Sequence, residues 1–307
     1  MKFITFQKPD GSIRAGWLKN EEYAVDMHEA TNGVLPKTML DFLENHEFFM
    51  EYLSSSSKLK NTDRGVYPLS DVKLMAPLPN PKSFRDFYAF EEHVKTARAN
   101  RGLDMIPEWY EIPVFYFSNH LSIKGPNEEI SPPKDCQWLD YELEIACIIG
   151  KEGKDIKAGE ADDYIFGYCI LNDWSARDIQ RKEMKVGLGP AKGKDFASSI
   201  GPYIVTKDEL ENFRVENGYD FLMTAKVNGT LLSEGNMQDI YYSFYEMIER
   251  ASDGVTLCPG EMIGSGTVGS GCILELGTDV HRWLKPGDEV ELEIANLGIL
   301  KNRIANE

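Results

Sequence analysis

The sequence predicts an α+β protein in which strands dominate, with a small N-terminal α/β unit at residues 1–75 and a larger, mainly β domain at residues 76–307. Three observations support this class. Apolar runs at strand spacing outnumber helical segments, 26 glycines separate many of these runs, and the proline-rich segment APLPNPK at residues 76–82 divides the two parts. The 307 residues suffice for one large domain with a small appendage.

The N-terminal unit begins with strands and continues with a helix. Alternation of apolar and polar residues predicts antiparallel strands over Lys2–Phe6, Ile13–Leu18 and Tyr23–Met27. Apolar residues at helical spacing then predict one helix over Thr38–Leu53, and the serine run Ser54–Ser57 is expected to end it.

Most of the larger domain has the pattern of strands. Helical periodicity predicts helices only over Phe84–Arg101 and Asp239–Ser252. Strands are expected at Pro113–Phe117, Tyr141–Ile149, Tyr164–Leu171, Ile200–Thr206, Asp220–Val227 and Val290–Ile294.

Composition restricts the classes of partner. Lys and Arg number 33 against 50 Asp and Glu, which leaves a net charge of -17 that repels nucleic acid and anionic membrane surfaces. The N-terminus lacks an apolar leader, and no stretch approaches the roughly 20 apolar residues of a membrane span. The five cysteines are scattered without a C-x-x-C pair, so we expect them to be reduced packing residues. The sequence therefore predicts a cytoplasmic protein with no nucleic-acid or membrane partner.

Gly264, Gly266 and Gly269 form a literal G-x-G-x-x-G, the pattern of a dinucleotide-binding loop. That loop requires a helix after the glycines to hold the pyrophosphate. Here the segment Cys272–Leu276 follows and has the apolar pattern of a strand, which argues against a dinucleotide site.

Acidic residues in two expected strands form a candidate metal site. Glu142 and Glu144 stand at i and i+2 of one strand and should share a face, while Asp173 ends the next strand. Several carboxylate oxygens are typical of a hard cation such as Mg²⁺ or Mn²⁺. The alternative is a solvated strand face, which we expect for the same alternation in the segment 289–293.

Asp86 and His93 are a second pair of interest. Seven residues, or about two helical turns, separate them on the expected helix, so both should face the same side. A lone histidine is more often structural than catalytic, and Asp86 taken alone also fits a helix-terminal charge.

Together these segments resemble the fumarylacetoacetate hydrolase family. The resemblance rests on D-F-Y-A-F-E-E-H, D-Y-E-L-E, L-N-D-W-S-A-R-D-I-Q, G-K-D-F, G-S-G-T and the C-terminal L-K-P-G-D-E-V-E-L-E-I-A-N-L-G, in the family's order from about residue 74. It implies the family's mixed β-sandwich roll, usually assembled as a homodimer.

The resemblance also implies functional residues. A magnesium-type ion, with Mn²⁺ or Ca²⁺ as alternatives, would be held by Asp86, Glu142, Glu144 and Asp173. His93 matches a general base with Glu275 as its partner, and Arg177, Gln180 and Lys194 match the polar groups around a developing oxyanion. Tyr116 and Thr267 match substrate-contacting residues.

Two residues differ from the pattern of the family's smaller, acylpyruvate-cleaving members. Thr96 stands three residues after His93, where smaller acylpyruvate-cleaving members carry a glutamate, and Ser118 stands where they carry a lysine. Both favour the fumarylacetoacetase arrangement. The arginine that would grip a substrate carboxylate is left open between Arg98, Arg101 and neither.

The resulting hypothesis is a metal-dependent hydrolase that cleaves a C–C bond in a small β-diketo acid, such as an acylpyruvate or a fumarylacetoacetate-like compound. One alternative with the same metal site is decarboxylation of a β-keto acid such as oxaloacetate. Isomerisation or hydration of a 2-oxo-enoate is another, and a non-catalytic binding protein is a third. The residues do not separate these reactions, because an enolate at one ion serves all of the catalytic ones.

Overall fold

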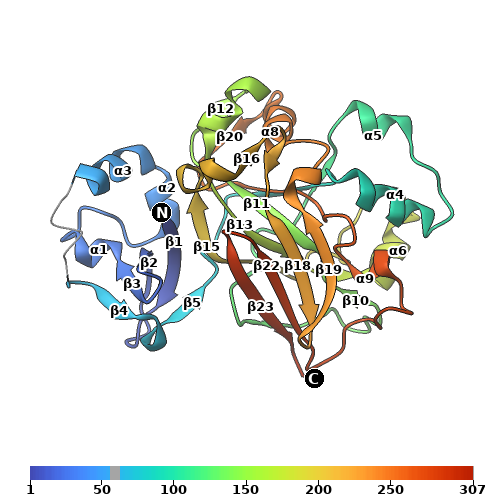
Figure 1. Cartoon of the computed structure of the whole chain (residues 1–307), viewed down its shortest axis with the longest axis horizontal. Helices are drawn as coiled ribbons and strands as arrows, with labels where there is room; N and C mark the ends of the chain where they lie inside the picture. The colour runs from blue at the N-terminus through green and yellow to red at the C-terminus, as the bar shows by residue number, and fades with distance from the viewer. Residues whose placement is uncertain (56–62, 307) are drawn as a thin grey trace.

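The computed structural model describes residues 1–55 and 63–306. Two β-sheets form most of the fold (Figure 1). Within these residues the larger sheet has twelve strands. Ten form a path of neighbours: β4 (Val66–Pro68), β3 (Tyr23–Asp26), β2 (Ile13–Lys19), β1 (Lys2–Gln7), β15 (Ser198–Thr206), β13 (Ile165–Asp173), β11 (Leu143–Ile149), β21 (Met262–Gly264), β6 (Phe84–Phe87) and β7 (Phe115–Phe117). The other two are β5 (Lys73–Met75), which pairs with β1, and β8 (Ile123–Lys124), which pairs with β15.

The second sheet has five strands within the same residues, in the order β19 (Thr230–Asn236), β18 (Leu222–Val227), β22 (Glu289–Ile294), β23 (Gly298–Ile304) and β9 (Glu129–Ile130). Three two-stranded pairs are β10 (Leu139–Asp140) with β14 (Ser175–Ala176), β12 (Gly153–Lys154) with β20 (Thr256–Leu257), and β16 (Arg214–Val215) with β17 (Gly218–Tyr219).

Short helices connect these strands. The α-helices of the described residues are α1 (Met27–Ala30), α2 (Met39–Leu43), α3 (His46–Ser55), α4 (Glu91–Ala99), α5 (Pro107–Glu111), α6 (Arg177–Met184), α7 (Lys207–Leu210), α8 (Phe244–Ser252) and α9 (Ile273–Leu276). Single 3₁₀ segments are η2 (Leu69–Asp71), η3 (Ala158–Tyr164), η4 (Glu211–Phe213) and η5 (Met237–Asp239). None of the helices described is long and apolar enough to cross a membrane.

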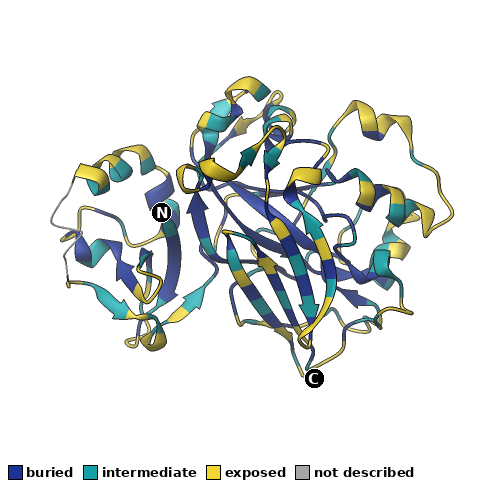
Figure 2. Ribbon diagram, viewed as in Figure 1, coloured by how far each residue is buried: buried dark blue, intermediate teal, exposed yellow. Residues whose placement is uncertain are grey.

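The core lies between the two sheets. Residues of β11 and β13 are buried throughout, so these strands are covered on both faces, as their nearly continuous apolar sequences require (Figure 2). Strand β22 instead alternates: Val290, Leu292 and Ile294 enter the core, while Glu291 pairs with lysines at the surface. The solvated face expected for the segment 289–293 is therefore confirmed. The predicted α+β, mainly β class is also confirmed.

The N-terminal strands extend the large sheet, and β1 pairs antiparallel with β15 (Figure 1). Phe3 and Phe42 pack with Phe166 of β13 in one apolar cluster. The boundary near residue 75 stays a prediction, because contacts of this kind do not test whether residues 1–75 fold alone. All five cysteines are free, as expected.

The six strands predicted for the larger domain lie within two residues of β7, β11, β13, β15, β18 and β22. The helices were predicted less well. The segment 84–101 is strand β6 followed by helix α4, because residues 84–87 pair with β21 and β7. Asp86 and His93 thus lie on different elements, and the prediction that they share one face of a helix was wrong. The segment 272–276 forms one helical turn, α9, where a strand was predicted.

Capping residues explain two further differences. The helix predicted over Thr38–Leu53 is broken at Glu44 and Asn45 into α2, which Thr38 caps, and α3. Ser54 and Ser55 lie inside α3, while Ser56 and Ser57 fall outside the described residues. The helix predicted from Asp239 begins at Phe244, where Ser243 and Glu246 form a capping box.

Candidate active site

Three carboxylates meet where neighbouring strands of the large sheet carry acidic residues. Asp86 lies on β6, Glu144 on β11 and Asp173 at the end of β13, and one oxygen of each lies within 4.8 Å of the others. Strand β21 separates β6 from β11, and its Gly264 pairs with Asp86. A Cβ atom on Gly264 would collide with Asp86 Oδ1, so only glycine lets this carboxylate reach across the strand.

Glu142 lies outside this group of three, although it was predicted as a fourth ligand. Arg177 Nη2 donates to Glu142 Oε1 at 2.8 Å, and Lys194 Nζ donates to Glu142 Oε2. The same Lys194 Nζ donates to Asp173 Oδ2 at 2.6 Å. A buried ammonium therefore joins Glu142 to the cluster formed by the other carboxylates.

The pKa values of Glu142 and Glu144 are shifted in opposite directions. Burial, reinforced by the charge of Asp86, raises the pKa of Glu144 well above its usual range. Burial also opposes ionisation of Glu142, but Arg177 and Lys194 outweigh it and hold its pKa below the usual range. Glu144 Oε2 is buried and has no hydrogen-bond partner among the described residues. Glu144 is thus the carboxylate that most needs a cation.

The donor set fits a hard divalent ion. Burial and the charge of Asp173 raise the pKa of Asp86, so two neighbouring carboxyls both resist ionisation unless a positive charge neutralises them. Oxygen-only ligands from Asp86, Glu144 and Asp173, with Glu142 adjacent, suit Mg²⁺, Mn²⁺ or Ca²⁺ rather than Zn²⁺. The residues present therefore fit the ion that the sequence predicted, and its identity is a matter for measurement.

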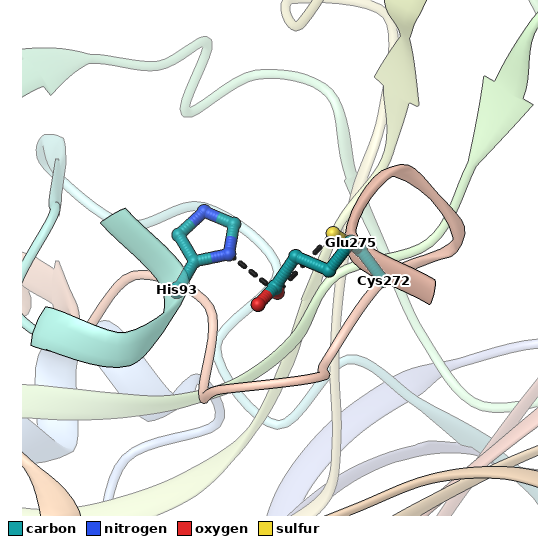
Figure 3. A group of neighbouring side chains, drawn as sticks. All are labelled: His93, Cys272 and Glu275. Atoms are coloured by element: carbon teal, nitrogen blue, oxygen red, sulfur yellow. Dashed lines mark hydrogen bonds and ion pairs between the residues drawn. The ribbon is translucent and has the colours of Figure 1, made fainter. Parts of the chain in front are cut away.

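A histidine and a glutamate form the second part of the site. His93 Nδ1 on α4 lies 2.5 Å from Glu275 Oε1 on α9 (Figure 3). A carboxylate only accepts hydrogen bonds, so Nδ1 carries a proton, and in the neutral imidazole Nε2 keeps the lone pair. Ser270 N donates to Glu275 Oε2 at 3.0 Å, and the Tyr88 ring contacts the imidazole edge-on. The imidazole is thereby oriented as a base.

Asp140 joins the two parts. It is fully buried and accepts from Arg177 Nε at 2.9 Å and from the backbone N–H groups of Ile273 and Leu274 at 2.8 and 3.0 Å. Gln180 Oε1 accepts from Arg177 Nη1 at 3.1 Å. The turn that carries Glu275 is therefore fixed to the arginine that pairs with Glu142.

The two predicted substrate-contacting residues lie against the carboxylates. Tyr116 donates its hydroxyl hydrogen to Asp173 Oδ2 at 2.6 Å, and Thr267 donates to Glu144 Oε1 at 3.1 Å. The structure thus brings all eleven predicted site residues into two adjoining groups, and their roles stay predictions. Arg98 and Arg101 each bond to a backbone carbonyl of their own segment, at Asp104 and Ala97, which leaves the choice between them open.

Sequence reasoning missed several supporting residues. Asp140 stands in the same D-Y-E-L-E segment as Glu142, so an acidic residue two positions earlier was an available signal. Glu183 accepts from the backbone N–H groups of three successive residues, 191–193, directly before Lys194. No sequence pattern indicated this contact, because it depends on how the loop folds back on α6.

A mixed-sheet fold that gathers buried carboxylates beside a His–Glu pair has the features of a metal-dependent enzyme. The family model described as fumarylacetoacetate hydrolase, C-terminal, matches residues 82–305, which is most of the chain. The protein belongs to the fumarylacetoacetate hydrolase family, as the sequence motifs predicted, and it is an enzyme of that superfamily.

Relatives of similar length carry several activities. An oxaloacetate tautomerase of Bacillus subtilis (strain 168) is 28% identical and covers 99% of this chain and 100% of its own. A mitochondrial oxaloacetate tautomerase of Bos taurus is 33% identical over 99% of this chain and 91% of its own. A solved structure of fumarylacetoacetate hydrolase from Exiguobacterium antarcticum has a TM-score of 0.76 at 27% identity, and each chain is covered completely. These relatives therefore do not identify C–C bond hydrolysis as the specific reaction of this protein.

Proposed function

We propose that the protein is a divalent-metal-dependent enzyme that interconverts the keto and enol forms of a small 2-oxo acid such as oxaloacetate. The observation that carries the proposal is the buried His93–Glu275 hydrogen bond beside three carboxylates suited to a cation. Full-length similarity to oxaloacetate tautomerases supports this substrate class. The sequence hypothesis of hydrolysis becomes the second candidate.

The side chains divide the chemistry between them. A divalent ion at Asp86, Glu144 and Asp173 would polarise substrate oxygens and lower the energy of an enolate. His93 Nε2 accepts a proton from the carbon next to the oxo group and returns it, while Glu275 keeps the Nδ1 proton in place.

Cationic side chains offset part of the negative charge of the acidic cluster. Arg177 and Lys194 are both buried, and each donates to Glu142. Their positive charges also make the site hospitable to the carboxylates of a dianionic substrate. Gln180 fixes the Arg177 guanidinium through its side-chain oxygen and so orients that charge.

Hydrolysis of a C–C bond is the second candidate because the same imidazole can deprotonate a water molecule instead of a carbon acid. In the neutral imidazole Nε2 has a lone pair that can accept this proton, and Glu275 would stabilise the imidazolium that forms. The two reactions differ in products: tautomerisation changes only the position of a proton, whereas hydrolysis of a β-diketo acid releases two carboxylic acids.

The test measures loss of the enol absorbance of oxaloacetate, and product formation from an acylpyruvate, with Mg²⁺ and with a chelator. We expect metal-dependent tautomerisation that falls by about 10²–10⁴-fold in His93→Gln, the range of one general base, with divalent-ion affinity nearly unchanged. The control is Glu291→Gln on the solvated face of β22. Unchanged activity in His93→Gln would remove His93 from the reaction, and two acids from the acylpyruvate would favour the second candidate.

Assembly and location remain proposals. We propose a homodimer, as the family resemblance suggests, and a cytoplasmic location. Light scattering coupled to size-exclusion chromatography measures the mass directly, and a monomeric mass would contradict the dimer.

A further inference from the structure

A second set of metal-ligating side chains lies outside the carboxylate cluster. A ring nitrogen of His93, Cys272 Sγ and a Glu275 oxygen lie within 4.8 Å of one another (Figure 3). The imidazole comes from α4, while the thiol and carboxylate come from the residue before α9 and from α9 itself. These residues therefore combine one nitrogen, one sulfur and one oxygen ligand in a small volume.

This ligand set differs in kind from that of the carboxylate cluster. Thiolate and imidazole favour Zn²⁺ and similar borderline ions, whereas Mg²⁺ takes oxygen ligands. We propose that His93, Cys272 and Glu275 form an inhibitory site for a Zn²⁺-type cation, separate from the site formed by Asp86, Glu144 and Asp173. Three protein ligands leave the fourth position of a tetrahedral ion to water.

Small displacements suffice to form the site. With ligand bonds of about 2.0–2.3 Å, tetrahedral geometry places ligand atoms roughly 3.3–3.7 Å apart. Cys272 Sγ already lies 3.5 Å from Glu275 Oε1. His93 Nδ1 lies 2.5 Å from the same oxygen and must retreat by roughly 1 Å. Ser270 N continues to hold the other oxygen of Glu275, so the carboxylate keeps its position.

Inhibition rests on the proposed function, in which His93 is the base, and the balance of protons explains it. Burial raises the pKa of the Cys272 thiol, so the sulfur is protonated before the ion binds and loses that proton to solvent. The Nδ1 proton of His93 gives way to the ion, and the neutral imidazole then carries its proton on Nε2. Thiolate and carboxylate together neutralise the two positive charges. One proton leaves for each ion bound, and Nε2 no longer has a lone pair to accept one.

The two metal sites are distinguishable by spectroscopy. Co²⁺ bound to a thiolate gives a near-ultraviolet charge-transfer band, whereas Co²⁺ bound only to oxygen does not. None of the carboxylate ligands Asp86, Glu144 and Asp173 is grouped with a cysteine among the described residues. A band that forms with excess Mg²⁺ present therefore reports a cysteine-containing site.

The experiment titrates the full-length protein with Co²⁺ under excess Mg²⁺, with long incubation because the side chains of His93 and Glu275 are only 5% and 2% exposed. We expect a saturable band in the unmodified protein and in Cys258→Ser, the matched cysteine control, and loss of the band in Cys272→Ser. His93→Gln is a second variant that should also lose it. No band in the unmodified protein, or a band that survives in Cys272→Ser, would overturn the proposal.

An independent readout follows the protons. Calorimetric titration with Zn²⁺ in buffers of different ionisation enthalpy should show release of one proton per ion, and Cys272→Ser should lose that release. This binding test does not depend on the substrate, so it can fail while the proposed tautomerase activity stands, and the reverse. Zinc binding without proton release would contradict coordination by the Cys272 thiolate.

Discussion

The charge of Glu144 should destabilise the metal-free protein and stabilise the protein with its cation. In Glu144→Gln a neutral amide of nearly the same shape replaces the carboxylate whose Oε2 has no partner among the described residues. The raised pKa values of Asp86 and Glu144 determine the sign of the effect on the free energy of unfolding. Their contribution to stability is complete below the usual carboxyl pKa of about 4 and is lost as the pH rises through the raised folded values.

The magnitude follows from the separation of the oxygens. At 4.8 Å, the upper limit of the separation between these oxygens, two unit charges repel by about 3.5 kcal/mol at an effective dielectric constant near 20. Lys194 offsets part of this repulsion, because its ammonium lies 2.6 Å from Asp173. We therefore expect metal-free Glu144→Gln to be more stable than the unmodified protein at pH 8 by about 1–3 kcal/mol. At this chain length that corresponds to a rise in Tm of about 2–5 °C.

Thermal unfolding of both proteins, with chelator and with Mg²⁺, tests the prediction. A ligand at one thousand times its Kd stabilises the unmodified protein by about 4.1 kcal/mol, and Glu144→Gln should gain much less, so the order of Tm should invert. The matched control is Glu291→Gln, which should show the normal response to Mg²⁺. A lower Tm for Glu144→Gln in chelator, or an equal gain from Mg²⁺, would refute the reasoning.

Three further substitutions test the supporting structure. Asp140→Asn should lower the free energy of unfolding by about 3–5 kcal/mol, because it leaves the buried Arg177 without one of its carboxylates. A loss below about 1 kcal/mol in denaturant unfolding would contradict that role. Glu183→Ala removes the acceptor of three backbone N–H groups before Lys194. It should lower the free energy of unfolding by about 1–2 kcal/mol and reduce kcat. Unchanged kinetics would show that the loop holds Lys194 without Glu183. Ser243→Ala removes the capping box of α8 and should cost about 1 kcal/mol without changing kcat relative to the unmodified enzyme, so a kinetic defect would be unexpected.

Local sequence predicted the strands better than the helices. Continuous apolar runs located β11 and β13 because a strand buried on both faces needs apolar residues at successive positions. The segment 84–101 was predicted as one helix because helical spacing continues across β6 and α4. Strand β6 forms only because β21 and β7 supply its hydrogen-bond partners, and both lie far away in the sequence.

The sequence by itself determined the family, the mainly β class and the identity of the acidic and basic side chains, because motifs and periodicity are properties of neighbouring residues. Only the tertiary structure decided how those side chains pair. It left Glu144 Oε2 without a partner among the described residues but gave Glu142 both Arg177 and Lys194. It also brought Glu275 to His93 across 182 positions of sequence. The physical reason is that charge pairing and burial depend on which strands lie side by side, and strand neighbours are set by long-range packing.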